Sequence, residues 1–336
     1  MKKIVFYHTD LDGYGVKVSA RIHYELSGID LNDVTFIKAD YYGDRQFIDT
    51  LINENVKGHE DEIDEIILGD ISVKGKEIAD YLDKFSKTKK VLLRDHHDTA
   101  TWMNEYSWAK VREKDDDGIF RSGTYWTHKE LLDDSYIEKH PNLKKFFYLV
   151  DMFDTWKWAK CGPKLNDAED LSLVFDALTE DGFDKEIYPK LISDKECDLY
   201  DEKVKFYLDY MHADLNRNAW ATYFSMRKGT YIYHGEDGDI PLKVGIISTS
   251  SGSSMITERL RDIFKKKGEK FDFIVNVTLK GGLALRAEDD CKVPCNLIVK
   301  QMTGGQGGGH PGSAGGCMDV KMIEMGLECT FPDLTF

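Results

Sequence analysis

The chain has 336 residues, of which 41% are hydrophobic and 31% are charged, and its formal net charge is −15. This balance is typical of a globular protein and excludes an intrinsically disordered chain. The length exceeds what one hydrophobic core usually serves, so we expect two domains. The acidic charge argues against a protein that binds long nucleic acid, because such proteins present a basic face to the phosphates. Small phosphorylated ligands remain open.

The sequence gives no sign of export or of membrane insertion. The apolar run near the N-terminus, residues 4–7, is too short for a signal peptide. No apolar run approaches the roughly 20 residues that a membrane span needs. Among the scattered cysteines only Cys291 and Cys295 are close, and Cys-x3-Cys without a second pair is a weak zinc signal. We expect a cytoplasmic protein with no membrane partner.

The first half of the chain alternates between strand-like and helix-like segments. Apolar, β-branched runs that end in polar turns occupy residues 3–7, 33–39, 62–70 and 89–97. Stretches with helical spacing, at 15–26 and 75–85, lie between them, and further helical segments follow at 122–132 and 142–156. This alternation predicts βαβ units and an α/β domain whose mostly parallel sheet is flanked by helices.

The second half predicts a helical connector and a smaller α/β domain. Residues 167–225 are charged, aromatic and without turn signals, and alternating strand patterns resume after them, with a hairpin expected around Gly281 and Gly282. We therefore divide the chain into a catalytic domain at 1–185, a helical connector at 186–225 and a second α/β domain at 226–336.

Acidic and histidine residues follow the predicted strands at the point where each strand ends. In parallel sheets, ligands gather outside the carboxyl ends of the strands. One further carboxylate, Asp151, lies in an apolar helical segment, where it needs a cation to compensate its charge. Each residue alone is explained equally well by a turn or a helix cap, but together they predict one shared site, made of His8, Asp10, Asp12, Asp70, Asp95, His96, His97 and Asp151.

The ligand types in this set favour a hard or borderline divalent cation. Carboxylates and imidazoles without a thiolate suit Mn²⁺, Mg²⁺ or a related ion. A pair of such ions needs a bridging carboxylate and clamps the attacking and leaving oxygens of a phosphoryl displacement. We predict two divalent ions, with Mn²⁺ first and Mg²⁺ or Co²⁺ as alternatives.

The same segments resemble the four motifs of the DHH phosphoesterase superfamily, in the same order. These segments are HTDLDG (8–13), LGD (68–70), RDHHDT (94–99) and LVDMFD (149–154). The segment GGGHPGSAGG (307–316) resembles the glycine-rich signature of the family's DHH-associated C-terminal domain, with Ser313 where alanine is common. The branch with a short His-x-Asp-x-Asp first motif, the oligoribonucleases that degrade nano-RNA, is the one that this chain resembles.

The resemblance implies a role for each residue of the shared site. His8, Asp10 and Asp70 would hold one ion, and the other would be held by Asp12, Asp70, His96 and Asp151, with Asp70 bridging. Asp95, His97 and Asp70 would form the catalytic set: His97 faces the scissile phosphate, and Asp95 orients a histidine through a hydrogen bond.

The resemblance also implies substrate-binding residues. Arg286 and the glycine-rich residues Gly308, Gly309 and His310 would hold a phosphate in the second domain. Ser122 and Thr124, with Gly123 between them, resemble a segment that approaches the substrate, although helix capping explains them equally well.

The implied reaction is hydrolysis of very short single-stranded oligonucleotides (nano-RNA) to mononucleotides by a metal-bridging hydroxide. Adenosine 3′,5′-bisphosphate and linear or cyclic dinucleotides are alternative substrates, and a nucleotide sensor without catalysis is a further alternative. We expect short oligonucleotides or dinucleotides as partners and no long nucleic acid, and a homodimer remains open.

Overall fold

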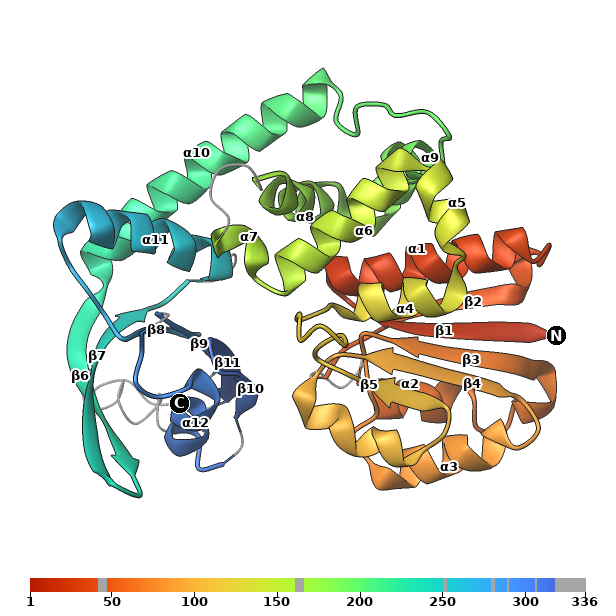
Figure 1. The fold of residues 1–336 in the computed structure, drawn as a ribbon, viewed down its shortest axis with the longest axis horizontal. Coiled ribbons are helices and arrows are strands. Elements are labelled where there is room, and N and C mark those ends of the chain that lie inside the picture. Colours follow the sequence, from red (N-terminus) through yellow and green to blue (C-terminus); the bar gives the residue numbers. More distant parts are fainter. Residues whose placement is uncertain are drawn as a thin grey trace, which may run out of the picture. The chain divides into compact units, whose positions relative to one another are not determined.

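The computed structural model divides the chain into two compact units, Met1–Leu208 and Asp209–Phe336. It describes residues 1–41, 47–160, 166–249, 253–278, 282–288, 290–305 and 307–317. Helix α10 (Glu202–Ser225) runs across the boundary between the units (Figure 1). Each unit has its own sheet, so the predicted fold class, α/β with two sheet domains, is confirmed.

The first unit is built on a parallel sheet of five strands. They are β1 (Lys2–His8), β2 (Val34–Ala39), β3 (Ile63–Gly69), β4 (Lys90–Asp95) and β5 (Ala109–Val111), and they lie in the order β2-β1-β3-β4-β5. All four pairings are parallel. The first four strands match the apolar runs seen in the sequence, whereas the three-residue β5 was not predicted.

The helices of this unit include the four segments with helical spacing. They are α1 (Leu11–Leu26), α2 (Ile48–Asn55), α3 (Lys76–Ser86), α4 (Gly123–Leu131), α5 (Asp134–Lys139), α6 (Pro141–Asp154), α7 (Lys157–Lys160), α8 (Asn166–Glu186) and α9 (Tyr188–Leu191). Three 3₁₀ helices, η1 (Leu31–Asp33), η2 (Glu60–Glu62) and η3 (Asp98–Glu105), complete the described elements of the unit. No helix in the described parts of the chain is both long and apolar enough to cross a membrane.

Alternate residues of the central strand supply two separate cores. Ile4 and Phe6 of β1 pack with α2 and α3, whereas Val5 and Tyr7 pack with α1. This follows from the two-residue period of a strand, which sends successive side chains to opposite faces. As a result α1 and α4 cover one face of the sheet, and α2 and α3 cover the other (Figure 1).

The strand order creates a natural position for a ligand. The chain proceeds from β1 to β2 on one side and then returns to β3 on the other side of β1. In doubly wound sheets, a crevice opens at such a switch point, outside the carboxyl ends of the strands. The predicted site residues that follow β1, β3 and β4 all lie at this edge.

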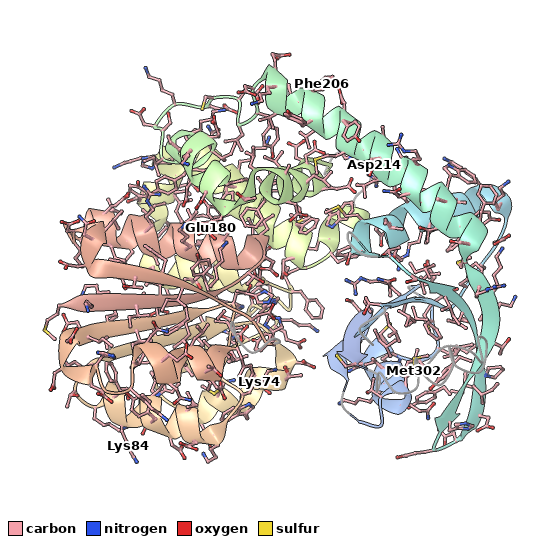
Figure 2. The ribbon with its side chains drawn as sticks, turned by 180° about the vertical axis from the view of Figure 1, so that it is seen from behind. Lys74, Lys84, Glu180, Phe206, Asp214 and Met302 are labelled. Atoms are coloured by element: carbon pink, nitrogen blue, oxygen red, sulfur yellow. The ribbon has the colours of Figure 1, made fainter. Side chains whose placement is uncertain are left out.

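A network of buried charges fastens α8 to the sheet layer. The Lys17 ammonium of α1 contacts the carboxylates of Glu180 and Asp184 on α8. Glu180 is labelled in Figure 2. The hydroxyl of Tyr7 donates to Glu180 at 2.8 Å, and the Lys38 ammonium of β2 lies 2.7 Å from the same carboxylate. The carboxylates of this network are therefore neutralised by lysine side chains of the same domain.

The second unit contains a mixed sheet in the order β10-β11-β9-β8-β7-β6. Its strands are β6 (Arg227–Gly235), β7 (Gly238–Ile247), β8 (Phe273–Val277), β9 (Gly282–Ala287), β10 (Gly308–His310) and β11 (Ser313–Cys317). Strands β7 and β8 pair in parallel, and the other pairs are antiparallel, including the predicted β8–β9 pair. Gly281, expected in the turn between β8 and β9, lies outside the described residues.

Two helices cover opposite faces of this sheet. Helix α11 (Ser253–Lys267) packs with Ile274 of β8 and with the end of α10. Helix α12 (Cys295–Met302) packs with the neighbouring β8 residues Phe273 and Val275. The alternation within β8 therefore gives this unit two apolar layers as well.

Candidate metal centre

The loop between β1 and α1 presents the first group of predicted ligands. Asp10 is the N-cap of α1, and its Oδ1 accepts a hydrogen bond from the Gly13 amide at 3.0 Å. The cap geometry turns the second oxygen toward His8, whose Nδ1 lies 2.8 Å from Asp10 Oδ2. The same Nδ1 lies 3.7 Å from Oδ2 of Asp70, so the ends of β1 and β3 meet here.

Asp70, directly after β3, is the most unusual residue of this edge. Its φ is 56°, in the left-handed region that few non-glycine residues adopt. The residue is 1% exposed, and neither carboxylate oxygen has a hydrogen-bond partner. Burial and the neighbouring Asp12 raise the pKa of Asp70 well above its ordinary value. A buried carboxylate without a partner is unfavourable, and a bound cation would remove the penalty.

A second group of ligand atoms gathers around His96. Its Nε2 lies 3.3 Å from Asp70 Oδ1, 3.8 Å from Asp12 Oδ2 and 3.5 Å from Asp154 Oδ2. The two oxygens of Asp70 therefore face two different groups, His8 with Asp10 on one side and His96 on the other. Burial and Asp12 raise the pKa of Asp154 to about 8, against the opposing effect of His96.

We call the six residues of these two groups the edge cluster: His8, Asp10, Asp12, Asp70, His96 and Asp154. Ligand atoms of His8, Asp10 and Asp70 lie within 4.8 Å of one another, and so do those of Asp12, His96 and Asp154. Only carboxylate and imidazole groups take part, which suits Mn²⁺ or Mg²⁺. The orphaned oxygens of Asp70 and Asp154 Oδ2, all buried without a hydrogen-bond partner, are what a cation would satisfy. The residues present fit a divalent metal ion.

The structure places Asp154, and not the predicted ligand Asp151, beside Asp12 and His96. Asp151 is buried, but its Oδ1 accepts from the Ser122 amide at 2.9 Å and its Oδ2 lies 3.0 Å from Arg121 and 3.2 Å from Lys157. The charge that the sequence left uncompensated in this apolar helix is thus neutralised by two side chains of the chain itself. Asp154 lies one helical turn further along α6 and faces the edge cluster.

The prediction that Ser122 and Thr124 approach the substrate also needs correction. Both residues are 0% exposed. Ser122 caps α4 by accepting from the Tyr125 amide at 3.1 Å, and the Thr124 amide donates to Asp12 Oδ1 at 2.9 Å. The Gly123 amide donates to Asp12 Oδ2 at 2.7 Å. The amides of this segment therefore hold the Asp12 carboxylate in place, and the Ser122 hydroxyl oxygen is occupied as the cap of α4.

Gly123 is required by the close approach of α4 to the strand end. A Cβ built on Gly123 would lie 2.5 Å from the Cβ of Asp70 and 2.8 Å from its Cα. Any side chain would push α4 away from β3 and with it the two amides that hold Asp12. The glycine thus positions two residues of the edge cluster at once.

Asp95, predicted to orient a histidine, is fully buried, and both of its carboxylate oxygens have hydrogen-bond partners. Its Oδ1 lies 2.7 Å from Nδ1 of His97 and accepts from the His96 amide at 2.7 Å. Its Oδ2 accepts from Ser72 Oγ at 2.5 Å and from the Tyr41 hydroxyl at 3.3 Å. Burial opposes ionisation, but His97 holds the pKa of Asp95 below its usual range. The arrangement fixes the His97 ring and leaves its Nε2 for another partner.

In the second unit, β11 lies between β9, which carries the predicted substrate-binding residue Arg286, and β10, which carries Gly308, Gly309 and His310. Ser313 of β11 pairs with Arg286 of β9 on one side and with His310 of β10 on the other. Arg286 donates to the hydroxyl of Ser313, at the position where the sequence departs from the family signature, and to Ser254 Oγ at 2.5 Å. The side chain of His310 lies outside the described part of the chain.

The two glycines of β10 have a structural explanation of their own. Gly309 has a φ of +130°, and a Cβ there would lie 2.7 Å from Ala314 Cα. Gly308 pairs with Gly315 across the same two strands. The tight β10–β11 pairing therefore requires Gly309 whether or not an anion binds there.

Comparison with known proteins gives one relative in sequence and several in fold. No family model matches the chain. It is 25% identical over 326 residues to the oligoribonuclease NrnB of Bacillus subtilis, which covers 93% of this chain and 72% of the relative. The fold is similar to that of a DHH domain from a member of a family of ribosomal proteins, with a TM-score of 0.65, 14% identity and coverage of 97% of this chain and 85% of the other. It is also similar to RecJ of Thermus thermophilus in complex with Mn²⁺, with a TM-score of 0.52, 12% identity and coverage of 99% and 52%.

The chain is thus similar in sequence to an oligoribonuclease, and its fold is that of a DHH-domain protein. The four segments that resemble the DHH motifs coincide with the ends of β1, β3 and β4 and with the end of α6.

Within the DHH motifs and around them, the sequence analysis missed Asp154, Ser72 and Tyr41. Asp154 is the second aspartate of the fourth motif, and its position at the last residue of α6 was a usable signal. Tyr41 follows the carboxyl end of β2, at the same edge as the other site residues, but a tyrosine in a turn carries no metal signal. Ser72 could be found only from the structure, because its role is to bond Asp95.

Proposed function

We propose that this protein is a metal-dependent phosphodiesterase that hydrolyses very short single-stranded oligonucleotides to mononucleotides. The similarity to an oligoribonuclease and the DHH-domain fold support hydrolysis of a phosphoester bond. The observation that carries the proposal is the carboxylate of Asp70, which is buried, strained in its backbone and without a hydrogen-bond partner at either oxygen. Strain and an unsatisfied charge at one residue are expected where function, and not stability, selects the arrangement.

The edge cluster would hold two divalent ions. His8, Asp10 and Asp70 form one set of ligands, and Asp12, His96, Asp154 and Asp70 form the other, with Asp70 shared. Divalent ions bound there would offset the negative charge on the attacking and leaving oxygens of a phosphoryl displacement. The neighbouring RecJ fold in complex with Mn²⁺ supports a divalent ion as the cofactor and Mn²⁺ as the first choice.

The chain's own groups would position the phosphate. His97 is partly exposed, and its Nδ1 donates to Asp95, so in its protonated form the ring would present Nε2–H to a phosphate oxygen. The buried Asp95 keeps the ring in this orientation through its further bonds to Ser72 and Tyr41. Because a misplaced donor loses most of its effect, this orientation would matter for rate more than for substrate affinity.

Residues of the second unit would bind the substrate. Arg286 of β9 is the proposed phosphate ligand, together with Gly308, Gly309 and His310 of β10, on the far side of β11. The Arg286 guanidinium already donates to Ser254 and Ser313, which hold it in one orientation. A fixed guanidinium can present two parallel donors to a phosphate.

The proposed substrate is short because the chain does not have the charge for a long one. Its net charge of −15 opposes a polyanion over any extended surface. A dinucleotide or a small oligonucleotide needs only a few local phosphate contacts. The name of the Bacillus relative, an oligoribonuclease, supports the same substrate class.

Turnover of a panel of substrates tests the proposal. The chelated protein is supplied with Mn²⁺, Mg²⁺ or Co²⁺ and assayed against a dinucleotide, a pentanucleotide, a 30-nucleotide strand, adenosine 3′,5′-bisphosphate and a cyclic dinucleotide. We expect the dinucleotide and the pentanucleotide to be hydrolysed fastest, with mononucleotides as products, and the chelated protein to be inactive. Preferential turnover of the bisphosphate or the cyclic dinucleotide would replace the proposed substrate. Nucleotide binding without metal-dependent turnover would make the protein a sensor.

A further inference from the structure

A cavity of about 300 Å³ lies between α10 and α11 in the second unit. Ligand pockets in proteins begin at roughly this volume. The cavity is lined by Asn216, Ala219 and Trp220 of α10 and by Arg259, Asp262, Ile263 and Lys266 of α11. None of these residues belongs to the edge cluster, and none lies on β9, β10 or β11, the strands that carry the proposed substrate-binding residues.

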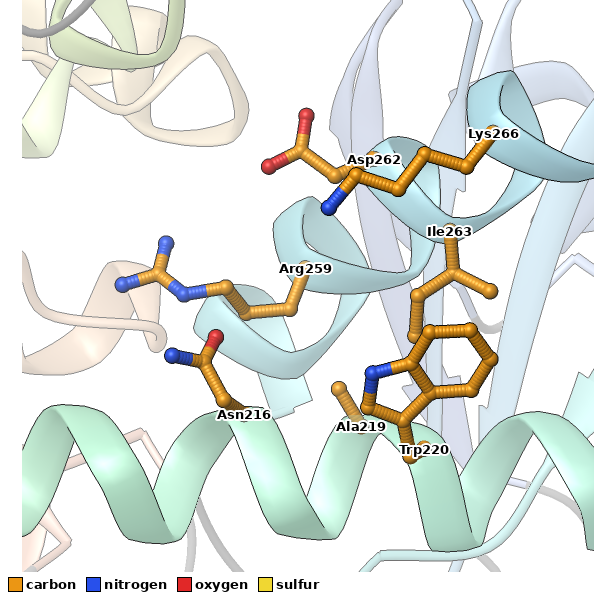
Figure 3. A pocket seen from close by; sticks show the side chains of 7 residues that line it. All are labelled: Asn216, Ala219, Trp220, Arg259, Asp262, Ile263 and Lys266. Atoms are coloured by element: carbon orange, nitrogen blue, oxygen red, sulfur yellow. The ribbon is translucent and has the colours of Figure 1, made fainter.

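The two ends of the cavity differ in chemistry. Figure 3 shows the indole of Trp220 beside the side chain of Ile263 at one end, and the guanidinium of Arg259 beside the amide of Asn216 at the other. The Trp220 side chain is exposed, at 37% for the whole residue, although a large aromatic ring gains most from burial. It stacks on Phe224, which is 77% exposed, with ring centroids 5.9 Å apart and an interplanar angle of 29°.

The charge around the cavity is opposite to that of the chain as a whole. Arg259 and Lys266 line it, and the Lys267 ammonium lies 5.7 Å from the centre of the Trp220 ring. Asp262 is the one acidic residue among the lining residues. A basic site on a chain of net charge −15 attracts an anion locally, without making the surface attractive to a polyanion.

We propose that this cavity binds a nucleoside monophosphate, at a site distinct from the metal centre. An exposed indole stacks on a nucleobase because every base offers a π-face. Arg259 and Lys266 would bind the phosphate, since guanidinium and ammonium groups are the usual phosphate partners. The Asp262 carboxylate, unfavourable next to a phosphate, suits a ribose hydroxyl as an acceptor, and the Asn216 amide can donate to or accept from the base edge.

The base, the ribose and the phosphate of the ligand would each contact a different group of lining residues. Inorganic phosphate would make no contact with the exposed indole, and an apolar ligand would gain nothing from the charges of Arg259 and Lys266. An acidic peptide would bury no flat ring against Trp220. The inference does not depend on catalysis at the edge cluster, because it rests only on residues of α10 and α11.

Binding of AMP to the full chain in EDTA, measured by titration calorimetry, tests the inference. The Arg286→Ala background removes the other proposed nucleotide site, so that any remaining binding reports on the cavity. In that background we expect Trp220→Ala to weaken AMP binding about 10-fold or more, because base stacking contributes about 1–3 kcal/mol per base. Trp220→Phe, which keeps an aromatic ring, should retain most of the affinity.

The cationic end has a matched control on the same helix. Lys266→Glu should weaken AMP binding about 10-fold, whereas Lys265→Glu, at an exposed neighbour that does not line the cavity, should change it less than about 2-fold. Adenosine and ribose 5-phosphate should both bind more weakly than AMP. Unchanged AMP binding in Trp220→Ala and Lys266→Glu would overturn the inference, and so would inorganic phosphate binding as tightly as AMP. These outcomes are independent of the hydrolysis assay, which reports only on the metal centre.

Discussion

The first unit contains two buried groups of carboxylates that differ in how their charge is neutralised. Glu180 and Asp184 of α8 meet the Lys17 ammonium, and Glu180 also meets Lys38 and the Tyr7 hydroxyl. At the edge cluster, Asp70 lies within 4 Å of three histidines, and its oxygens have no hydrogen-bond partner. One group is neutralised by the fold, whereas the other is left for a ligand.

The pKa shifts express the same contrast. Burial alone would raise the pKa of Glu180, but the Lys17 ammonium holds it below its ordinary value. Burial and Asp12 together raise the pKa of Asp70 well above its ordinary value. A pair inside the fold thus stabilises the ionised carboxylate, and the unpaired site stabilises it only when a cation is bound. Four sets of substitutions test this difference, from the largest expected effect to the smallest.

Asp70→Asn should have opposite effects on activity and on stability. We expect hydrolysis to fall more than about 100-fold, because loss of outer partners of metal ligands alone typically reduces activity about 10–100-fold. In EDTA the free energy of unfolding should rise by about 1 kcal/mol or more, since an unpaired buried charge is removed. Asparagine tolerates the positive φ of this position, so the backbone is preserved.

The two effects of Asp70→Asn are measured by turnover with Mn²⁺ and by urea unfolding in EDTA. A second measurement sharpens the contrast: excess Mn²⁺ should raise the unfolding midpoint of the unsubstituted protein and leave the Asp70→Asn midpoint nearly unchanged. Hydrolysis that survives Asp70→Asn would refute the two-metal site.

Lys17→Met should destabilise the fold and spare the chemistry. It leaves Glu180 and Asp184 without their shared cation, and breaking a buried ion pair typically costs about 3–5 kcal/mol. Urea unfolding measures the loss. Turnover of the folded fraction should stay within about 2-fold, because none of these groups lies in the edge cluster. Lys87→Met, which breaks an exposed pair with Asp83, is the matched control and should leave stability nearly unchanged.

Asp154→Asn and Asp151→Asn compare two aspartates one turn apart on α6. We expect Asp154→Asn to reduce Mn²⁺ affinity and turnover about 10–100-fold, because it removes a carboxylate of the edge cluster. Asp151→Asn should mainly lower the free energy of unfolding, since it breaks the contacts with Arg121 and Lys157. Calorimetric Mn²⁺ titration separates the two, and the reverse order of effects would restore Asp151 as the ligand.

Ser122→Ala has the smallest expected effect. The substitution removes the N-cap hydrogen bond of α4 and should cost about 1 kcal/mol of stability. Because Ser122 is buried, KM for a dinucleotide should not change, which steady-state kinetics can verify. A raised KM with unchanged stability would return Ser122 to the substrate site.

Much of the site could be predicted because it follows from strand ends. A β-branched apolar run that stops at a charged residue marks the carboxyl end of a strand, and in a parallel sheet these ends meet at one edge. His8, Asp10, Asp12, Asp70 and His96 were found in this way. The sequence analysis also predicted that Asp95 orients a histidine, and in the structure its Oδ1 lies 2.7 Å from Nδ1 of His97.

The errors arose where a charge is balanced by residues distant in the chain. Asp151 looked uncompensated because Arg121 lies 30 positions away, in a loop that folds back on α6. Ser122 and Thr124 looked available because their polar groups are visible in the sequence, whereas their burial is not.

The sequence by itself determined the α/β class, the two sheets and the set of motifs, because periodicity and strand-end chemistry are local properties. Only the tertiary structure decided which carboxylates are paired and which are not. Glu180, Asp151 and Asp70 are all buried acidic residues, and nothing local distinguishes them. Lys17 neutralises Glu180 where α1 meets α8, and Arg121 and Lys157 neutralise Asp151 of α6. The oxygens of Asp70 are left without a hydrogen-bond partner.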